Sequence, residues 1–157
     1  MRACDDVAMA DRAPTTPLER VKVQRERLAE AADALERSVT RPSGNEAAWR
    51  DATLVAADEV GASLAAHVDE VESADGLFEV IMSRSPRLAH EIERLRREHT
   101  NLGSEISELE VLARSADATV DDIRESALVL LADISRHRHR GADLIWESFD
   151  FDIGEGD

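Results

Sequence analysis

The stretch SPRLAHEIERLRREHTNLGSEISELEVLAR, residues 85–114, decides the fold of this chain. Its apolar positions, with one histidine among them, recur in alternating steps of four and three residues: Leu88, Ile92, Leu95, His99, Leu102, Ile106 and Leu109. A mean spacing of about 3.5 residues keeps such side chains on one face of an α-helix, and that face packs against neighbouring helices. Ser85 and Pro86 supply an N-cap and a proline at the first helical position. We therefore expect a helix from this pair to about Arg114.

Three other stretches share this spacing, at about residues 17–39, 46–72 and 119–148. Each begins at a residue that can act as an N-cap, namely Thr16, Asn45 and Thr119. The short stretch LFEVIMSR, between the second and third long segments, predicts one or two helical turns at an end of the fold. Four long amphipathic segments with short links, and no strand-like alternation, are typical of an all-α, up-and-down antiparallel four-helix bundle.

The composition agrees with one helical domain. The chain has 157 residues, of which 43% are apolar and only 3% aromatic, so its core has to be built from Leu, Ile, Val and Ala. Such residues favour tightly packed helices over sheets. We expect residues 16–148 to form the bundle, between a flexible leader at 1–15 and an acidic tail at 149–157.

The charge and the apolar pattern exclude several classes of partner. Acidic residues outnumber basic residues 34 to 19, a formal charge of −15, which repels phosphate backbones and anionic lipids. We therefore expect neither nucleic acid nor a membrane as a partner. Cys4 is the single cysteine, and no apolar run approaches the ~20 residues of a membrane span. The acidic start does not resemble a signal peptide, so we expect a cytoplasmic protein.

Three histidines interrupt the apolar faces. His67, His99 and His137 each occupy an inward position of a different helix. A buried imidazole needs a partner for both ring nitrogens, and three converging imidazoles are a common transition-metal site. At about 1.5 Å per residue, His99 and His137 should lie within roughly 5 Å in height and His67 within roughly 10 Å of them. These heights allow a shared layer without requiring one.

The surroundings of these histidines resemble a known family. The second long segment carries Leu64-Ala-Ala-His67, the third Arg-Arg-Glu-His ending at His99, and the fourth Ile134-Ser-Arg-His137. In these motifs and in the closing stretch from Arg140 to Glu147, the chain resembles the hemerythrin-like (HHE cation-binding) domains. The resemblance implies an up-and-down four-helix bundle that holds a non-haem iron pair through histidines and bridging carboxylates. It further implies oxygen binding, iron handling, or sensing of oxygen or nitric oxide.

The chain departs from the family pattern at several ligand positions. The first helix offers Arg25 where the family has a histidine, and the carboxylates expected four residues after His67 and His137 are replaced by Val71 and Gly141. We therefore expect a reduced site with a single iron or zinc ion, or none if the site is vestigial. Carried onto this chain, the ligands are His67, His99 and His137. Glu70 lies three residues after His67 and can turn inward to help them. Dioxygen would be the small ligand if the metal is iron.

Two other interpretations stay open. The bundle could be a metal-free interaction or scaffold protein, with its histidines hydrogen-bonded in the core and a second copy or another protein as its partner. It could also be a proton-sensitive regulator, because buried histidines titrate near neutrality. No nucleophile-and-base pair, phosphate-binding glycine loop or dinucleotide fingerprint identifies an enzyme. His90 and His139 are expected on the surface.

Overall fold

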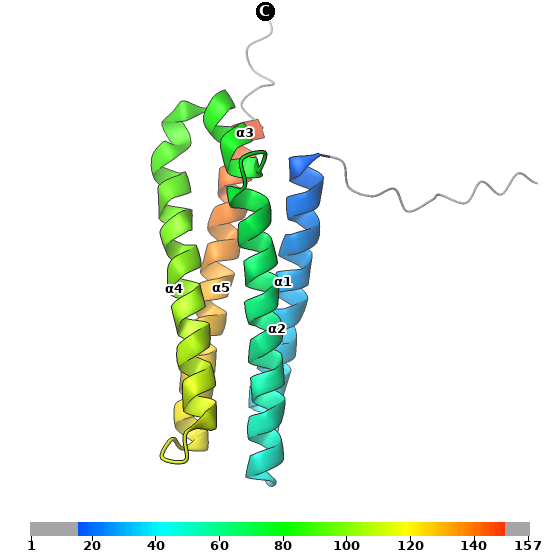
Figure 1. The fold of residues 1–157 in the computed structure, drawn as a ribbon, viewed down its shortest axis with the longest axis vertical. Coiled ribbons are helices and arrows are strands. Elements are labelled where there is room, and N and C mark those ends of the chain that lie inside the picture. Colours follow the sequence, from blue (N-terminus) through cyan, green and yellow to red (C-terminus); the bar gives the residue numbers. More distant parts are fainter. Residues whose placement is uncertain (1–15, 150–157) are drawn as a thin grey trace, which may run out of the picture.

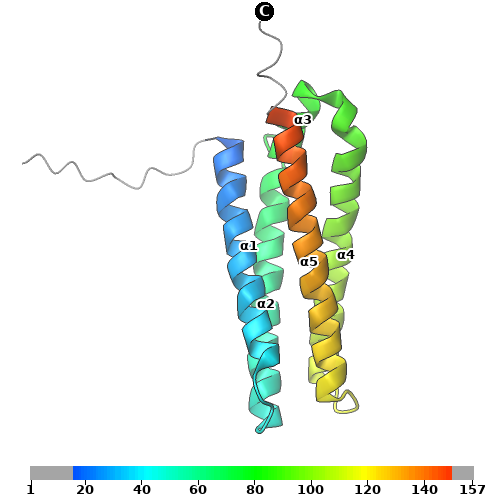
Figure 2. The ribbon, with the colours of Figure 1, turned by 180° about the vertical axis from the view of Figure 1, so that it is seen from behind.

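The fold is taken from a computed structural model, which describes residues 16–149. Its helices, in chain order, are α1 (Pro17–Thr40), α2 (Glu46–Glu72), α3 (Leu77–Arg84), the 3₁₀ turn η1 (Pro86–Leu88), α4 (Ala89–Arg114) and α5 (Val120–Phe149). The four long helices stand side by side as rods and the short α3 lies at one end of them (Figures 1 and 2). No strand occurs within the described range. The predicted all-α four-helix bundle is confirmed.

The N-caps predicted at Thr16, Asn45 and Thr119 are present in the structure. The Thr16 hydroxyl accepts from the Glu19 backbone N–H at 3.1 Å, and the Glu19 carboxylate accepts from the Thr16 N–H at 2.9 Å. This reciprocal pair is a capping box, and it satisfies two backbone donors that a helix end leaves free. The side chain of Asn45 accepts from the backbone N–H of Ala48 at 3.1 Å. The hydroxyl of Thr119 accepts from the backbone N–H of Asp122 at 3.1 Å.

The start of the third long helix differs from the prediction. Ser85 makes no side-chain cap and Pro86 begins the 3₁₀ turn η1, so the α-helix starts at Ala89. The backbone N–H of Leu88 donates to the Ser85 carbonyl at 2.9 Å, a bond of the tighter 3₁₀ type. The first turn is thus closed by the backbone rather than by the Ser85 hydroxyl.

The apolar core is divided into two clusters along the bundle. The larger cluster includes Leu28 of α1, Leu64 of α2, Leu102 of α4 and Ile134 of α5. The smaller cluster lies toward α3 and is built from Val21, Val71, Leu77, Phe78, Ile81, Leu88, Ile92, Leu95 and Leu144. Every long helix contributes to both clusters, so each helix has a position where it passes from one to the other. Those positions form the site described below.

The remaining expectations concern the termini and the membrane. The predicted leader at 1–15 lies outside the described residues, as does the tail beyond Phe149. None of the helices within residues 16–149 has the combination of length and apolarity that crossing a bilayer requires.

Removal of a core side chain tests the larger cluster. Leu35 of α1 is fully buried, and we expect Leu35→Ala to lower the free energy of unfolding by about 2–5 kcal/mol, because it removes buried methyl groups and leaves a cavity. Val55 of α2 is 72% exposed, and Val55→Ala should change stability by no more than about 0.5 kcal/mol. Urea denaturation followed by circular dichroism measures both. Equal effects of the two substitutions would contradict this packing.

Candidate metal centre

A polar layer separates the two apolar clusters. In α2, His67 lies between Leu64 of the larger cluster and Val71 of the smaller one. His99 of α4 and His137 of α5 occupy the corresponding positions in their helices, and Arg25 does so in α1. The three histidines are only 4–6% exposed. Each long helix therefore supplies one inward polar side chain at this level of the bundle.

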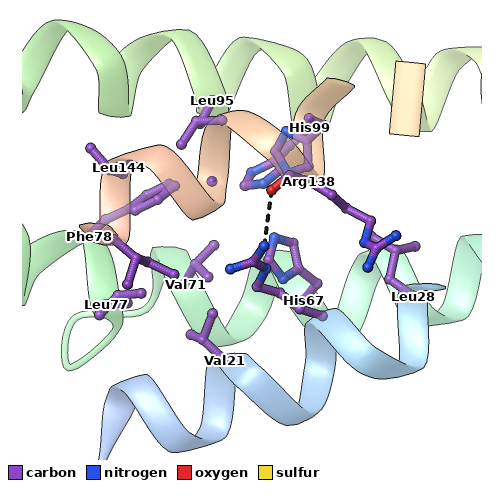
Figure 3. A pocket seen from close by; sticks show the side chains of 14 residues that line it. Val21, Leu28, His67, Val71, Leu77, Phe78, Leu95, His99, Arg138 and Leu144 are labelled. Atoms are coloured by element: carbon purple, nitrogen blue, oxygen red, sulfur yellow. Dashed lines mark hydrogen bonds between the residues drawn. The ribbon is translucent and has the colours of Figure 1, made fainter. Parts of the chain in front are cut away.

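The layer borders a small cavity of about 20 Å³ (Figure 3). Such a volume has room for one small ligand beside the imidazoles. In the figure, Phe78, Leu77 and Leu144 lie on one side of the imidazoles and Leu28 on the other, so apolar side chains enclose the cavity at both ends. The ring of Phe78, from α3, is nearly parallel to that of His99, with 6.0 Å between their centroids. The short helix predicted at the end of the bundle thus covers the site.

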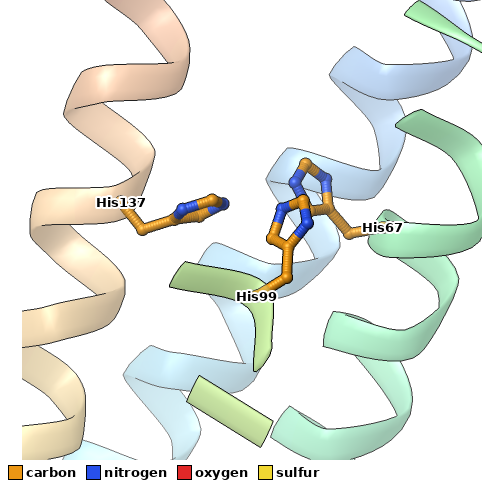
Figure 4. Close-up of side chains that lie close together, drawn as sticks. All are labelled: His67, His99 and His137. Atoms are coloured by element: carbon orange, nitrogen blue, oxygen red, sulfur yellow. The ribbon is translucent and has the colours of Figure 1, made fainter. Parts of the chain in front are cut away.

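The three imidazoles meet, as the sequence spacing allowed (Figure 4). The ring centroids of His99 and His137 are 4.7 Å apart, those of His67 and His99 5.3 Å, and those of His67 and His137 5.7 Å. One ring nitrogen from each lies within 4.8 Å of the others. Nitrogens bound to one tetrahedral ion at about 2.1 Å lie about 3.4 Å apart. An inward movement of the rings on the order of 1 Å would therefore suffice to share an ion.

Two glutamates orient two of these rings. Nδ1 of His99 lies 2.5 Å from Oε1 of Glu72, and Nδ1 of His137 lies 3.0 Å from Oε2 of Glu98. A carboxylate that accepts from Nδ1–H fixes the tautomer, so Nε2 carries the lone pair. The other oxygen of Glu98 accepts from Arg140 at 2.5 Å, which holds the carboxylate in place. Histidines that bind metal ions usually donate their other ring N–H to a carboxylate, a backbone carbonyl or water.

The sequence reasoning missed both Glu72 and Glu98. Each contacts a histidine of a neighbouring helix, and spacing along one helix does not reveal such a contact. The predicted ligand Glu70 is placed elsewhere, because its carboxylate accepts from Arg20 at 2.6 Å and is not part of the histidine cluster. Both outlying histidines, His90 and His139, are exposed as expected.

Two fully buried ring nitrogens of the cluster lack a hydrogen-bond partner among residues 16–149. They are Nδ1 of His67 and Nε2 of His99. A buried polar atom without a partner costs about 1–3 kcal/mol and usually marks a place where water or an ion binds. The donor set of the three histidines thus fits a bound metal ion.

The electrostatics keep the cluster neutral. Burial, together with the nearby His99, His137 and Arg25, lowers the pKa of His67 to about 3. Burial and the nearby His137 lower the pKa of His99 to about 3, although the charge of Glu98 opposes the shift. The pKa of His137 is lowered by burial, although the hydrogen bond to Glu98 opposes the shift. Neutral imidazoles are the form that binds metal.

Comparisons of the chain with protein-family models, with curated proteins and with solved structures found no match. The likeness to hemerythrin-like domains therefore rests on the sequence motifs alone and stays a prediction. What the site can do has to be argued from its own residues.

The buried histidines make stability depend on pH. In the unfolded chain an imidazole has a pKa near 6.5, and in the folded protein the pKa of His67 is about 3. Between these values the unfolded chain binds more protons, so acid favours unfolding. We expect the free energy of unfolding of the metal-free protein to be level above about pH 7. Below pH 6.5 it should fall by up to about 1.4 kcal/mol per pH unit for each buried histidine.

Denaturation between pH 5 and 7 measures this slope. His67→Gln removes one of the titrating groups and should make the slope shallower. His90→Gln, a substitution on the exposed face of α4, should leave it unchanged. An identical slope in wild type and His67→Gln would contradict the assignment of His67 as a buried neutral imidazole.

Proposed function

We propose that this bundle binds a single transition-metal ion through His67, His99 and His137, as a reduced relative of the hemerythrin-like domains. The observation that carries the proposal is the buried cluster itself, in which one nitrogen from each ring lies within 4.8 Å of the others. The unpartnered Nε2 of His99 and Nδ1 of His67 support it, because both atoms lie where a ligand would satisfy them. The neutral state of the rings supports it as well.

One ion fits the described residues better than the iron pair of the family. A pair of irons needs carboxylates that bridge them, and none of the described residues that line the cavity is acidic. The carboxylates of Glu72 and Glu98 are occupied on the outer nitrogens of His99 and His137. Val71 and Gly141 line the cavity where the family would supply acids.

Zinc and ferrous iron are the proposed ions. Imidazole nitrogens suit both metals, and three histidines leave one coordination position for an outside ligand. With iron, that ligand could be dioxygen, and the protein would serve oxygen sensing or iron storage. This finer role follows from the family likeness and from the open position.

Metal analysis of protein purified without an affinity tag tests the proposal. We expect about one zinc or iron per chain, and a rise in unfolding free energy of about 2.7 kcal/mol when free metal is a hundredfold above its dissociation constant. Ferrous iron is added without oxygen. The double substitution His99→Ala/His137→Ala should abolish both effects, whereas His90→Ala should preserve them.

The rival interpretation, a metal-free scaffold bundle, makes the opposite forecast. A folded wild-type protein that neither contains metal nor gains stability from zinc or ferrous iron would refute the proposal. Circular dichroism of each variant separates loss of binding from loss of folding.

The glutamates around the site offer a matched pair of substitutions. Glu72 orients His99, so Glu72→Ala should weaken zinc binding by roughly 10- to 100-fold, the usual effect of removing such a partner. Glu70, on the same helix, is paired with Arg20 and would have to leave that pair to act as a ligand. We expect Glu70→Ala to weaken zinc binding less. Isothermal titration calorimetry measures both, and a larger loss in Glu70→Ala would establish Glu70 as a ligand.

A further inference from the structure

The fourth member of the polar layer is a cation. Arg25 of α1 lines the same cavity as the three histidines, and its Nη2 donates to the backbone carbonyl of Arg138 at 3.0 Å, the bond drawn as a dashed line in Figure 3. Within residues 16–149, no carboxylate forms an ion pair with it. A guanidinium has five N–H donors and stays protonated in proteins. Arg25 therefore brings a positive charge and spare donors to the cavity.

The charge of Arg25 acts on the cluster. It is among the causes that lower the pKa values of His67 and His137, so the guanidinium lies close enough to both rings to disfavour a proton on them. A bound divalent cation would experience the same repulsion more strongly.

The described lining of the cavity contains nothing that would compensate. Its charged side chains are the basic Arg25 and Arg138, and its other residues are the three histidines and apolar or glycine positions. The nearest acids lie outside the lining, and Glu98 is already shared with Arg140 at 2.5 Å and Arg94 at 3.5 Å. Glu72 is close to Arg96, whose charge acts on its carboxyl group.

Metal binding would therefore place two further positive charges among three buried histidines, beside the charge of the partly buried Arg25. Three neutral imidazoles add no negative charge, and they leave one position on a tetrahedral ion open. Glu72 and Glu98 act at Nδ1 of His99 and His137, and no described residue that lines the cavity is acidic. An anion from outside the chain would pair with the charge at the open position.

We propose that the site takes a small monovalent anion together with its metal, and that this anion fills the open coordination position and accepts hydrogen bonds from Arg25. The inference rests on the metal-binding function proposed above. The cavity of about 20 Å³ and its apolar walls restrict the anion to the size of a halide or formate. A planar guanidinium is well suited to a carboxylate of that kind.

Gly141 explains why the anion has to come from outside. It lies one helical turn after His137 and lines the cavity, and a Cβ placed on it would meet no atom within 4 Å. The backbone therefore has room for a side chain here, and an aspartate at this position could supply a built-in carboxylate.

Cobalt(II) is the probe metal, because its visible absorption reports its coordination. In a buffer whose own anion is a bulky sulfonate, formate or chloride added to the cobalt-loaded wild type should change the spectrum in a saturable way and tighten cobalt binding. Arg25→Met should weaken formate binding by roughly 10- to 100-fold, because a charge-assisted hydrogen bond is lost. The same variant should bind cobalt in the absence of formate at least as tightly as wild type, because a repulsive charge has been removed.

Two controls sharpen the result. Arg27→Met, an exposed arginine two residues further along α1, should behave as wild type. Gly141→Asp should bind cobalt tightly without formate and no longer respond to it, whereas Gly141→Ala should keep the response.

The outcomes separate this inference from the function on which it rests. A wild-type protein that binds no cobalt or zinc overturns both. If cobalt binds but formate and chloride leave its spectrum and affinity unchanged, only the anion proposal fails. The proposal fails equally if Arg25→Met responds to formate as wild type does, or if formate binds with the same affinity to metal-free protein.

Discussion

The constraint on which this structure depends is the cost of a polar layer in the middle of an apolar bundle. Each long helix interrupts its apolar face once, and the interruptions coincide at Arg25, His67, His99 and His137. Buried imidazoles and a guanidinium lose their hydration, which costs several kcal/mol unless partners replace the water. The protein replaces it at some atoms, through Glu72, Glu98 and the Arg138 carbonyl. At Nδ1 of His67 and Nε2 of His99 it does not.

The ring nitrogens of the layer therefore differ in hydrogen bonding: some have a carboxylate partner and others have none. The nitrogens that face outward, Nδ1 of His99 and His137, meet carboxylates that hold the rings in one orientation. Such positioning lowers the entropy that these two rings would lose on binding an ion, and it leaves the lone pair of each ring on Nε2. A core histidine that served packing alone would gain more from a partner on both nitrogens. The two unpartnered nitrogens are the feature that the proposed binding site accounts for and a fully hydrogen-bonded core does not.

The features that the sequence could predict are those that depend on a single helix. Helical spacing shows which side of α4 faces inward, and so the amino-acid pattern alone identifies His99 as a core residue. The height of His67 relative to His99 depends on where α2 begins and on the links between helices, and spacing leaves that undetermined by roughly 10 Å. Glu72 and Glu98 lie off the apolar faces and act across helix boundaries, so no pattern along the chain distinguishes them from surface acids. At Ser85 the local signal predicts a helix start but not the tighter turn, because the two differ only in which backbone carbonyl is bonded.

The departures from the hemerythrin-like pattern form one consistent change in charge. Relative to that pattern, a neutral ligand is replaced by the cation Arg25, while carboxylates are replaced by the uncharged Val71 and Gly141. Each substitution moves the cavity in the positive direction, and none compensates another. The three histidines are buried, His99 and His137 are held by carboxylates, and the arginine lines the cavity. If the cluster binds a metal as proposed, the described lining of the cavity supplies no negative charge, and that charge would arrive with a ligand.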